Sequence, residues 1–512
     1  MIGLERLGFI YCHLKIMRGG IFLGKMPLRL MPSVKSRTET VVTLLMLCLV
    51  AMIPCPAQKI AIVGGTLIDL SNYGRSANDI ADSVVLIDGE KIVAAGPASQ
   101  IAVPPGVSRV DAHGRFVIPG LIDGWGAMRA QSFANAYLYE GVTTVYVPTV
   151  LPDGGGDGEL KILRNASPGP RLFLGAPMTG YSEIGADPSD KPMLNHRLHD
   201  RRLSNEQLIA RIDSLADQGY RGLTISYDVW PDQVDVIVAE ARRRGLATLG
   251  EPAFTSAPYA IHAGIDTLLH DDHYTTELAP AEAKLARADN LSDVGAVNRA
   301  VFAIDPASSA VTDYGTQLSK AHTTLMPTLV LEATANSLDV PNPWSAPSAA
   351  LIKAADLDNP VDPVTGASGW LAAIPTEKRE HVREFGRHKE ALDARFYQLG
   401  AKFLAGSAAT SYGVMPGSGL HREIALLHRI GLSPREAVAA ATANFAAVYP
   451  WQDVGRIEPG RAADILILDA DPRTDISAVD QIGTLVFKGA IVDRNRLLTE
   501  ISSKSSAGSP SS

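Results

Sequence analysis

The middle of the chain opens on an apolar stretch that reads Val117-Ile118-Pro119-Gly120-Leu121-Ile122-Asp123. A short apolar run bounded by turn residues is typical of a buried strand. It is the first of eight such candidate strands, which lie at 117–122, 142–147, 171–175, 222–226, 246–250, 265–269, 323–329 and 401–405. All eight are short enough to be strands rather than helices.

Helical patterns separate these candidate strands. One predicted helix spans about 231–243, and the three arginines and Gly245 that follow suit a helix C-terminus. Another begins at Ser433, where Pro434 and Glu436 complete an N-terminal capping signal before an alanine-rich stretch at 437–447. Strands alternating with helices predict an α/β fold, a (β/α)₈ TIM-like barrel with its site at the carboxyl ends of the strands.

Both ends of the chain read differently from the middle. Residues 58–117 and 450–497 contain short β-rich runs separated by turns such as Asp88-Gly89 and Lys488-Gly489. They predict a composite β-sandwich, built from both chain ends, beside a barrel at 118–449. The tail at 498–512 is rich in serine and glycine, which predicts disorder.

The first 57 residues are predicted to be an N-terminal extension and signal peptide. Lys35 and Arg37 precede an apolar run at 41–53, and small residues precede a cleavage site after Ala57. The run is too short to span a bilayer comfortably, so we expect a periplasmic or secreted protein with no stable membrane span after cleavage. An uncleaved anchor is the alternative, and Met1, Met26 and Met31 are all possible starts.

Composition limits the chemistry. All three cysteines lie within the first 55 residues, so a cleaved chain has no thiol ligand or nucleophile. Without residues 1–57 the formal charge falls from −8 to −13, because 40 basic residues then face 53 acidic ones. Such a surface repels phosphate backbones, which argues against nucleic acid as a partner. The 12 histidines and 55 carboxylates would permit a metalloenzyme.

Several motifs keep a common order along the chain. After Val117–Asp123 come Gly141–Thr144, Ala263–His270, Met326–Leu329 and Gly455–Asp464. In these motifs the chain resembles the amidohydrolase superfamily, particularly its imidazolonepropionase-like and prolidase-like members. The resemblance implies a barrel with a composite sandwich. It also implies hydrolysis of carbon–nitrogen (non-peptide) bonds in amides and cyclic amides, and of dipeptides, by one or two divalent metals in the barrel mouth.

The resemblance fails at most metal-ligand positions. The positions that correspond to the family's ligands hold Trp125, Ala127, Thr224, Glu251, His270 and Ala408. Only Glu251 and His270 offer a suitable donor, and two donors fall short of the three that catalytic zinc usually has. The ordinary metal centre is therefore predicted to be absent, with no cofactor.

Two hypotheses follow. In the first, the protein is an exported amidohydrolase relative without a working metal centre. It binds a small molecule at a barrel-mouth pocket, or acts as a partner subunit in a homo-oligomer or a hetero-oligomer with an active homologue. The residues expected in that pocket are Trp125, Ala127, Thr224, Tyr227 and Ala408.

In the second hypothesis, the protein is a divergent hydrolase of amide, cyclic amide or X-Pro substrates. Glu251, His270 and Asp272 would then be catalytic, and Glu251 with His270 would bind one divalent metal such as zinc. Asp272 belongs to a polar cluster at 270–273 whose four side chains are not expected to converge. A separation of more than about 7 Å between Glu251 and His270 would exclude a shared ion, because each metal–ligand bond is about 2 Å.

Overall fold

The computed structural model describes residues 59–150, 167–180, 202–284, 295–338 and 340–505. The predicted signal peptide and its cleavage site lie outside these ranges. Residues Gln58–Ser512 belong to one compact unit. Among the described residues, none of the helices combines the length and the apolar character needed to cross a membrane.

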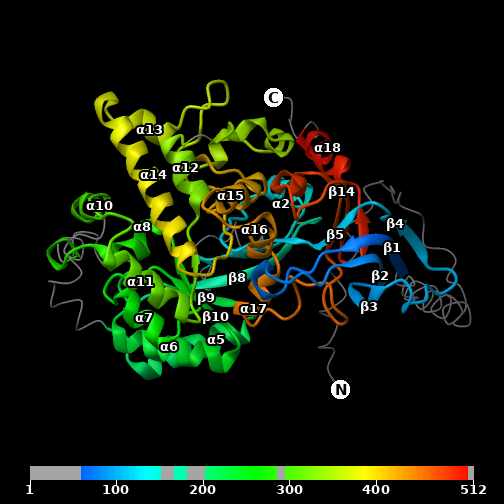
Figure 1. Cartoon of the computed structure of the whole chain (residues 1–512), viewed down its shortest axis with the longest axis horizontal. Coiled ribbons are helices and arrows are strands. Elements are labelled where there is room, and N and C mark those ends of the chain that lie inside the picture. Colours follow the sequence, from blue (N-terminus) through cyan, green and yellow to red (C-terminus); the bar gives the residue numbers. More distant parts are fainter. Residues whose placement is uncertain (1–58, 151–166, 181–201, 285–294, 339, 506–512) are drawn as a thin grey trace, which may run out of the picture. The chain divides into compact units, whose positions relative to one another are not determined.

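Seven strands form a parallel sheet in the order of the sequence (Figure 1). They are β6 (Leu121–Asp123), β7 (Val142–Val147), β8 (Arg171–Met178), β9 (Gly222–Ile225), β10 (Ala247–Gly250), β11 (Thr267–Leu269) and β12 (Thr324–Met326). Helices follow most of these strands, as in a TIM-like barrel. The predicted fold class is confirmed.

The eighth predicted strand, 401–405, is not a regular strand. It makes a single parallel bridge, between Phe403 and Leu325. The amide of Ala405 then donates to the carbonyl of Ala440 at 3.0 Å, so the ladder with β12 does not continue. On its other side, Gly124 N–H donates to the carbonyl of Ala405 at 3.1 Å. The segment therefore occupies the eighth position, between β12 and the end of β6, without strand geometry.

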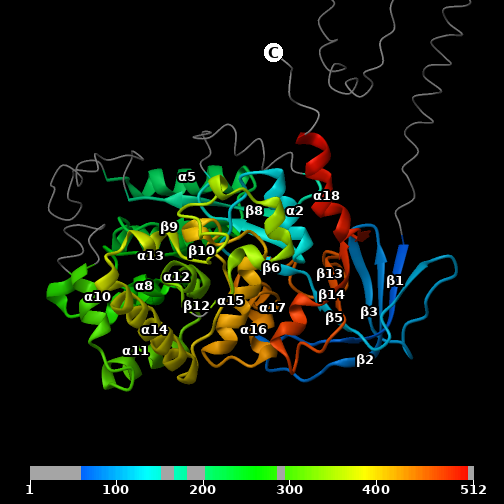
Figure 2. The ribbon, with the colours of Figure 1, turned by 90° about the horizontal axis from the view of Figure 1, so that it is seen from above.

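Helices cover the outside of this sheet (Figure 2). Their bounds are α2 (Gln131–Tyr139), α5 (Asn205–Asp217), α6 (Pro231–Arg244), α7 (Ala257–Ala263), α8 (Asp271–Tyr274), α10 (Gly295–Phe302), α11 (Ser309–Lys320), α12 (Leu329–Asn336), α13 (Gly369–Ala373), α14 (Thr376–Gln398), α15 (Ser418–Arg429), α16 (Pro434–Ala440), α17 (Ala443–Val448) and α18 (Arg494–Ser505).

Two predicted helix ends are confirmed. Helix α6 ends at Gly245, which has a left-handed φ of 66°, and the Ser433–Glu436 capping box begins α16. The alanine-rich stretch at 437–447 forms two helices, because Thr442 leaves the helical region with a φ of −144° and separates α16 from α17.

The second sheet has eight strands and draws on both ends of the chain. Its order is β15-β14-β13-β5-β1-β2-β3, with β4 paired to β1. The strands are β1 (Lys59–Leu67), β2 (Ile80–Asp88), β3 (Lys91–Pro97), β4 (Ser108–Asp111), β5 (Phe116–Pro119), β13 (Ile465–Leu468), β14 (Ile482–Phe487) and β15 (Ala490–Val492). A composite sheet from both termini is confirmed.

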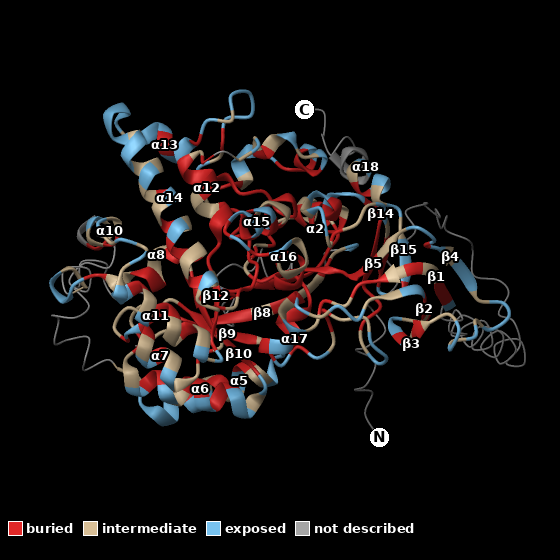
Figure 3. Ribbon diagram, viewed as in Figure 1, coloured by how far each residue is buried: buried red, intermediate tan, exposed pale blue. Residues whose placement is uncertain are grey.

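The predicted strand at 117–122 is in fact two strands in two sheets. β5 pairs with β13 in the composite sheet, whereas β6 pairs with β7 in the barrel. The chain passes between the sheets at Gly120, where a Cβ atom would collide with the side chain of Thr143. Buried residues continue through both sheets (Figure 3), so the apolar run serves two cores.

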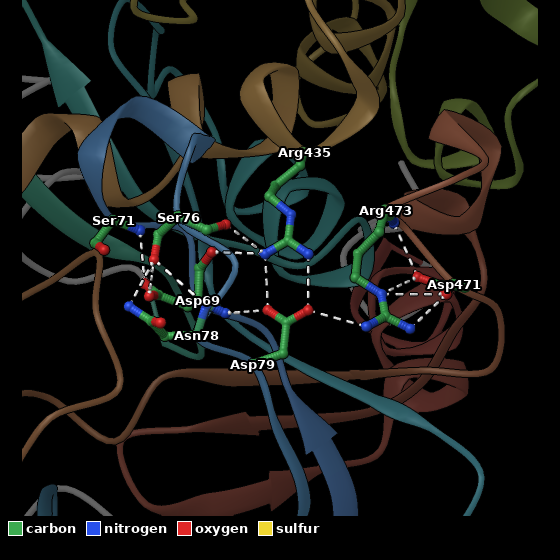
Figure 4. Close-up of polar contacts among 8 residues, drawn as sticks. All are labelled: Asp69, Ser71, Ser76, Asn78, Asp79, Arg435, Asp471 and Arg473. Carbon is green, nitrogen blue, oxygen red and sulfur yellow. Dashed lines mark hydrogen bonds and ion pairs between the residues drawn. The ribbon is translucent and has the colours of Figure 1, made fainter.

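An arginine–carboxylate network ties the composite sheet to the barrel helices (Figure 4). Arg435, on α16, donates two hydrogen bonds of 2.7 Å to the carboxylate of Asp79, just before β2. Arg473, between β13 and β14, adds a third of 2.9 Å. Bidentate arginine pairs of this kind are among the stronger polar contacts in proteins.

Helix α18 corrects the predicted boundary of the tail. The helix runs to Ser505, so the disorder expected from residue 498 does not hold for 498–505. Leu497, on the first turn of α18, is 3% exposed in the barrel core, which anchors the helix. The rest of the predicted tail, 506–512, lies outside the described residues.

Candidate active site

Two neighbouring strand ends bring Glu251 and His270 together. Glu251 directly follows β10 and His270 directly follows β11, and the two strands pair in parallel. Their side chains meet at the barrel mouth, with His270 Nε2 4.0 Å from Glu251 Oε2. This separation is well below the distance of about 7 Å beyond which the two side chains could not bind the same ion.

His273 joins this pair and was not among the predicted catalytic residues. Its Nε2 lies 3.0 Å from Glu251 Oε2, so it is the nearer of the two histidines. Residues 271–274 form the single helical turn α8, with His270 at its N-cap. The i, i+3 spacing of the two histidines was the available signal, but it places them on one side only if the segment is helical.

The tautomer of neutral His270 follows from its neighbours. Its Nδ1 lies 2.7 Å from the hydroxyl of Thr328, and that hydroxyl donates to the carbonyl of Pro327 at 2.6 Å. Because the Thr328 hydroxyl already donates its only proton to Pro327, His270 Nδ1 must carry a proton and donate it to the hydroxyl oxygen. Nε2 then presents a lone pair toward Glu251 whenever the ring is neutral. Burial lowers the pKa of His270, which favours the neutral ring.

The charge state of Glu251 reflects two opposing influences. Burial, the larger one, raises its pKa, but the nearby charges of His273 and then His270 together bring the pKa below the usual value. Glu251 is therefore a carboxylate at neutral pH. A carboxylate beside imidazoles is an arrangement suited to proton transfer or to holding a cation.

The aspartates of the same segment point to different partners. Asp272 lies near the histidines, with Oδ1 3.7 Å from His273 Nε2. Asp271 is instead buried against Lys389 of α14, whose ammonium is 3.4 Å from its Oδ1. The expectation that the four side chains at 270–273 do not all converge is thus met, although the reason is a helical turn rather than strand alternation.

One group of acidic residues among the described residues has the spacing for a metal ion. It comprises Asp271, Asp272 and Glu332, whose oxygens lie within 4.8 Å of one another. Lys389 already neutralises part of this group, because its ammonium is also 2.8 Å from Glu332. A divalent cation would be repelled by that ammonium, so this group is a poor metal site.

Two aromatic residues flank the histidines. Trp125 packs edge-on against His270 with ring centroids 5.3 Å apart, and Tyr227 stacks on His273 at 5.1 Å. Ala408 is adjacent to Trp125, because its amide donates to the Trp125 carbonyl at 2.8 Å. The rings fix the orientation of both imidazoles.

The remaining predicted positions have other hydrogen-bonding roles. Thr224 is 5% exposed, and its hydroxyl donates to the carbonyl of Pro148 at 2.8 Å. The amide of Ala127 donates to the hydroxyl of Tyr137 at 3.3 Å. Neither residue presents a donor atom for a metal.

Asp123 forms structural hydrogen bonds at the barrel mouth. It is fully buried and accepts hydrogen bonds from the Ser407 hydroxyl at 2.6 Å and the Ser407 amide at 2.9 Å. Burial raises its pKa to about 6 despite these bonds. Asp123 therefore joins the turn after β6 to the turn after 401–405.

A cavity of about 210 Å³ opens beside the pair formed by Glu251 and His273. Phe254, Thr255 and Lys284 are among its other lining residues. None of the five residues predicted to form the pocket lines this cavity. The cavity thus lies on the β10 side of the mouth, where only Glu251 of the predicted site residues contacts it.

Comparison with known proteins agrees with this architecture. A model of the Amidohydrolase family matches residues 381–492. The imidazolonepropionase of Symbiobacterium thermophilum is 24% identical over 477 residues, which cover 87% of this chain and 98% of that protein.

Solved structures share the fold at low sequence identity. A Xaa-Pro dipeptidase with bound methionine has a TM-score of 0.55 and 16% identity, over 85% of this chain and 100% of that one. Molinate hydrolase has a TM-score of 0.56 and 19% identity, over 86% of this chain and 96% of that one. The chain is thus similar in sequence to an imidazolonepropionase and to part of the Amidohydrolase family model, and it shares the fold of these solved hydrolases.

The superfamily's metals do not fit the residues at the corresponding positions. The side chains of Trp125, Ala127 and Ala408 have no atom that binds a metal. The hydroxyl of Thr224 donates a hydrogen bond to the carbonyl of Pro148. Glu251 and His270 remain, with His273 as an added neighbour. A two-metal centre of the family type therefore lacks ligands here.

Proposed function

We propose that this protein is an exported member of the amidohydrolase superfamily that binds a small organic molecule at the barrel mouth without the family's metal centre. The loss of ligands carries the proposal: four of the six corresponding positions, Trp125, Ala127, Thr224 and Ala408, offer no donor to a metal. Without a Lewis acid, hydrolysis of an amide loses a major source of transition-state stabilisation.

The surroundings of the mouth support a binding role. Beside the cavity that Glu251 and His273 line, the rings of Trp125 and Tyr227 pack against His270 and His273. Binding sites for small molecules usually combine an apolar lining with a few polar groups that orient the ligand. The 210 Å³ cavity beside Glu251 favours a small ligand with a hydrogen-bond donor or positive charge.

Elemental analysis with a substrate panel tests this proposal. The mature protein is purified without chelators, its metal content is measured, and it is assayed on amides, cyclic amides and X-Pro dipeptides. We expect less than stoichiometric metal and no turnover. Stoichiometric zinc, manganese or iron, together with turnover that chelation abolishes, would contradict it.

A second candidate function is supported by the convergence of Glu251, His270 and His273. Distances of 3.0 and 4.0 Å to one carboxylate oxygen are compatible with an acid–base set, or with one divalent metal such as zinc. In this hypothesis the protein is a divergent hydrolase of carbon–nitrogen bonds, and Asp272 assists His273.

Variants at these residues separate the two candidates. If the hydrolase hypothesis holds, Glu251→Gln and His270→Asn each remove turnover, while the exposed-site control His322→Asn retains it. Equal turnover in all three variants would exclude the hypothesis. The binding hypothesis instead predicts no turnover in any of them, and a changed ligand affinity in Glu251→Gln.

A barrel without catalytic activity could instead act as a subunit of a larger complex. We propose that such a role would take the form of a homo-oligomer, or of a complex with an active homologue. Light scattering of the purified protein, alone and mixed with a homologue that retains all the ligands, measures both. A monomer in every mixture would exclude this role.

A further inference from the structure

A second cavity lies away from the barrel mouth. It has a volume of about 660 Å³ and is bordered by α15, the end of α2, residues 340–347 and the start of α18. Helix α2 contacts α18 in the structure, and both helices lie near α15 (Figures 1 and 2). None of the mouth residues lines it.

Two arginines in this cavity have no carboxylate partner among the described residues. Arg422, on α15, donates only to the carbonyl of Asn342, at 2.9 Å. Arg494 donates to the carbonyls of Tyr139 and Ile482 and stacks over the Tyr139 ring. Burial lowers the pKa of Arg422 to about 10, so it is still charged at neutral pH. Both arginines are half-buried, where a charge without a nearby anion is less well solvated than at the surface.

The other charges of the cavity are largely balanced. His421 pairs with Asp480 at 2.6 Å, and Arg429 pairs with Glu390. Glu140 is the remaining carboxylate, and it makes no ion pair with either Arg422 or Arg494. Although burial, the largest influence, lowers the pKa of His421, its hydrogen bond to Asp480 and the nearby carboxylates bring that pKa above the usual value, which favours the protonated ring. With His421 protonated, two arginines against one glutamate leave a single net positive charge. A ligand with one negative charge would neutralise it.

Unsatisfied polar atoms and an apolar wall complete the cavity. The Ser418 hydroxyl and Glu140 Oε1 are buried without a hydrogen-bond partner. Ser418 is 6% exposed and lines the cavity, so its hydroxyl is available to a ligand. Val340, Pro341 and Leu426 form an apolar wall. The cavity therefore combines an uncompensated positive charge, an unused hydroxyl and an apolar surface.

We propose that this cavity binds an organic monocarboxylate, with the carboxylate at Arg422 and Arg494 and an apolar body along Val340, Pro341 and Leu426. The Ser418 hydroxyl donates to the same carboxylate. The site is separate from the barrel mouth and is independent of whether the mouth hydrolyses or only binds its ligand.

Calorimetry with three matched probes tests the charge requirement. Sodium hexanoate is titrated into the full-length protein, and hexanamide and hexylammonium serve as the neutral and positively charged probes. We expect saturable binding of hexanoate with one site per chain, and at least about tenfold weaker binding of the other two. Absence of saturable hexanoate binding, or equal binding of hexanamide, would overturn the proposal.

Variants locate the binding. Arg422→Gln is expected to weaken hexanoate binding by at least about tenfold, whereas Arg429→Gln, on the same helix but paired with Glu390, changes it less than about twofold. Ala425→Trp fills the cavity from an exposed position and abolishes binding without removing any charge. Trp125→Ala leaves binding unchanged. Loss of binding in Trp125→Ala, or retention in Arg422→Gln and Ala425→Trp, would overturn the assignment.

Discussion

His273 Nε2 lies 3.0 Å from Glu251 Oε2, so the carboxylate that follows β10 has its nearest charged neighbour on the turn α8. His270 is farther from the same oxygen, at 4.0 Å. The polar centre of the mouth is therefore organised around Glu251, with His273 as its nearer histidine. The ionisation of Glu251 depends on this arrangement.

Replacing His273 with asparagine is expected to raise the pKa of Glu251. Burial already favours the protonated acid, and His273 is the main opposing influence. Without it the pKa of Glu251 rises, because the effect of burial is then opposed only by the weaker influence of His270. Carbon-13 NMR of labelled glutamate carboxyls measures the change, with Glu251→Gln to assign the signal. His322→Asn is the control, and an unchanged titration in His273→Asn would contradict the assigned pair.

Lys389 is expected to be essential for stability. Its side chain is 2% exposed, and its ammonium lies within 3.4 Å of Asp271 and 2.8 Å of Glu332. Lys389→Met leaves buried carboxylates without a counter-charge, which costs about 3–5 kcal/mol at pH 7. Urea unfolding measures the loss, and the exposed Lys378→Met on the same helix is expected to change stability by less than about 0.5 kcal/mol. A loss of similar size in both variants would show that the buried position is not special.

Glu423 is expected to reduce stability at alkaline pH. It is fully buried on α15 and accepts a 2.8 Å hydrogen bond from the Val330 amide. Burial raises its pKa to about 8. The folded state therefore binds a proton that the unfolded state, with a pKa of about 4.3, has released, so stability falls as the pH rises from about 4.3 through 8.

Glu423→Gln keeps the acceptor for Val330 and removes the ionisation. We expect the stability of this variant to depend less on pH than that of the natural protein. At pH 9 the variant should be the more stable of the two. Urea unfolding at pH 5, 7 and 9 gives the comparison, and Glu377→Gln, at an exposed position on α14, is the control. Parallel stability curves for Glu423→Gln and the natural protein would argue against the raised pKa.

Asp79 is expected to stabilise the contact between the composite sheet and the barrel. It accepts from both Arg435 and Arg473, and these bonds bring its pKa below the usual value although burial, the largest single influence, raises it. Asp79→Asn should cost about 2 kcal/mol at pH 7, and the cost should disappear as the pH falls through the pKa of the folded state. Urea unfolding measures this, with Asp111→Asn as an exposed control. Equal costs at pH 7 and pH 3 would contradict it.

The barrel and the composite sheet were predictable because short apolar runs and turn residues depend on local sequence. The prediction that Trp125 and Ala408 replace metal ligands rests on the motif positions alone. The division of 117–122 into β5 and β6 could not, because Gly120 is required by Thr143, which belongs to another strand. His273 was missed because its direction depends on the helical geometry of α8.

The unpaired arginines show the same limit. Arg422 and Arg494 come from distant parts of the chain, and only packing reveals that no described carboxylate pairs with either of them. Asp271 was likewise grouped with its sequence neighbours, whereas its charge partner is on α14. Local patterns predict which elements form, and tertiary packing determines which charges meet.

We propose that the barrel mouth has no metal centre of the amidohydrolase type. Anomalous diffraction from crystals grown with zinc or manganese, recorded at the absorption edge of each metal, is the decisive measurement. We expect no anomalous peak within bonding distance of Glu251, His270 or His273. A fully occupied metal peak bound by these residues would exclude the proposal.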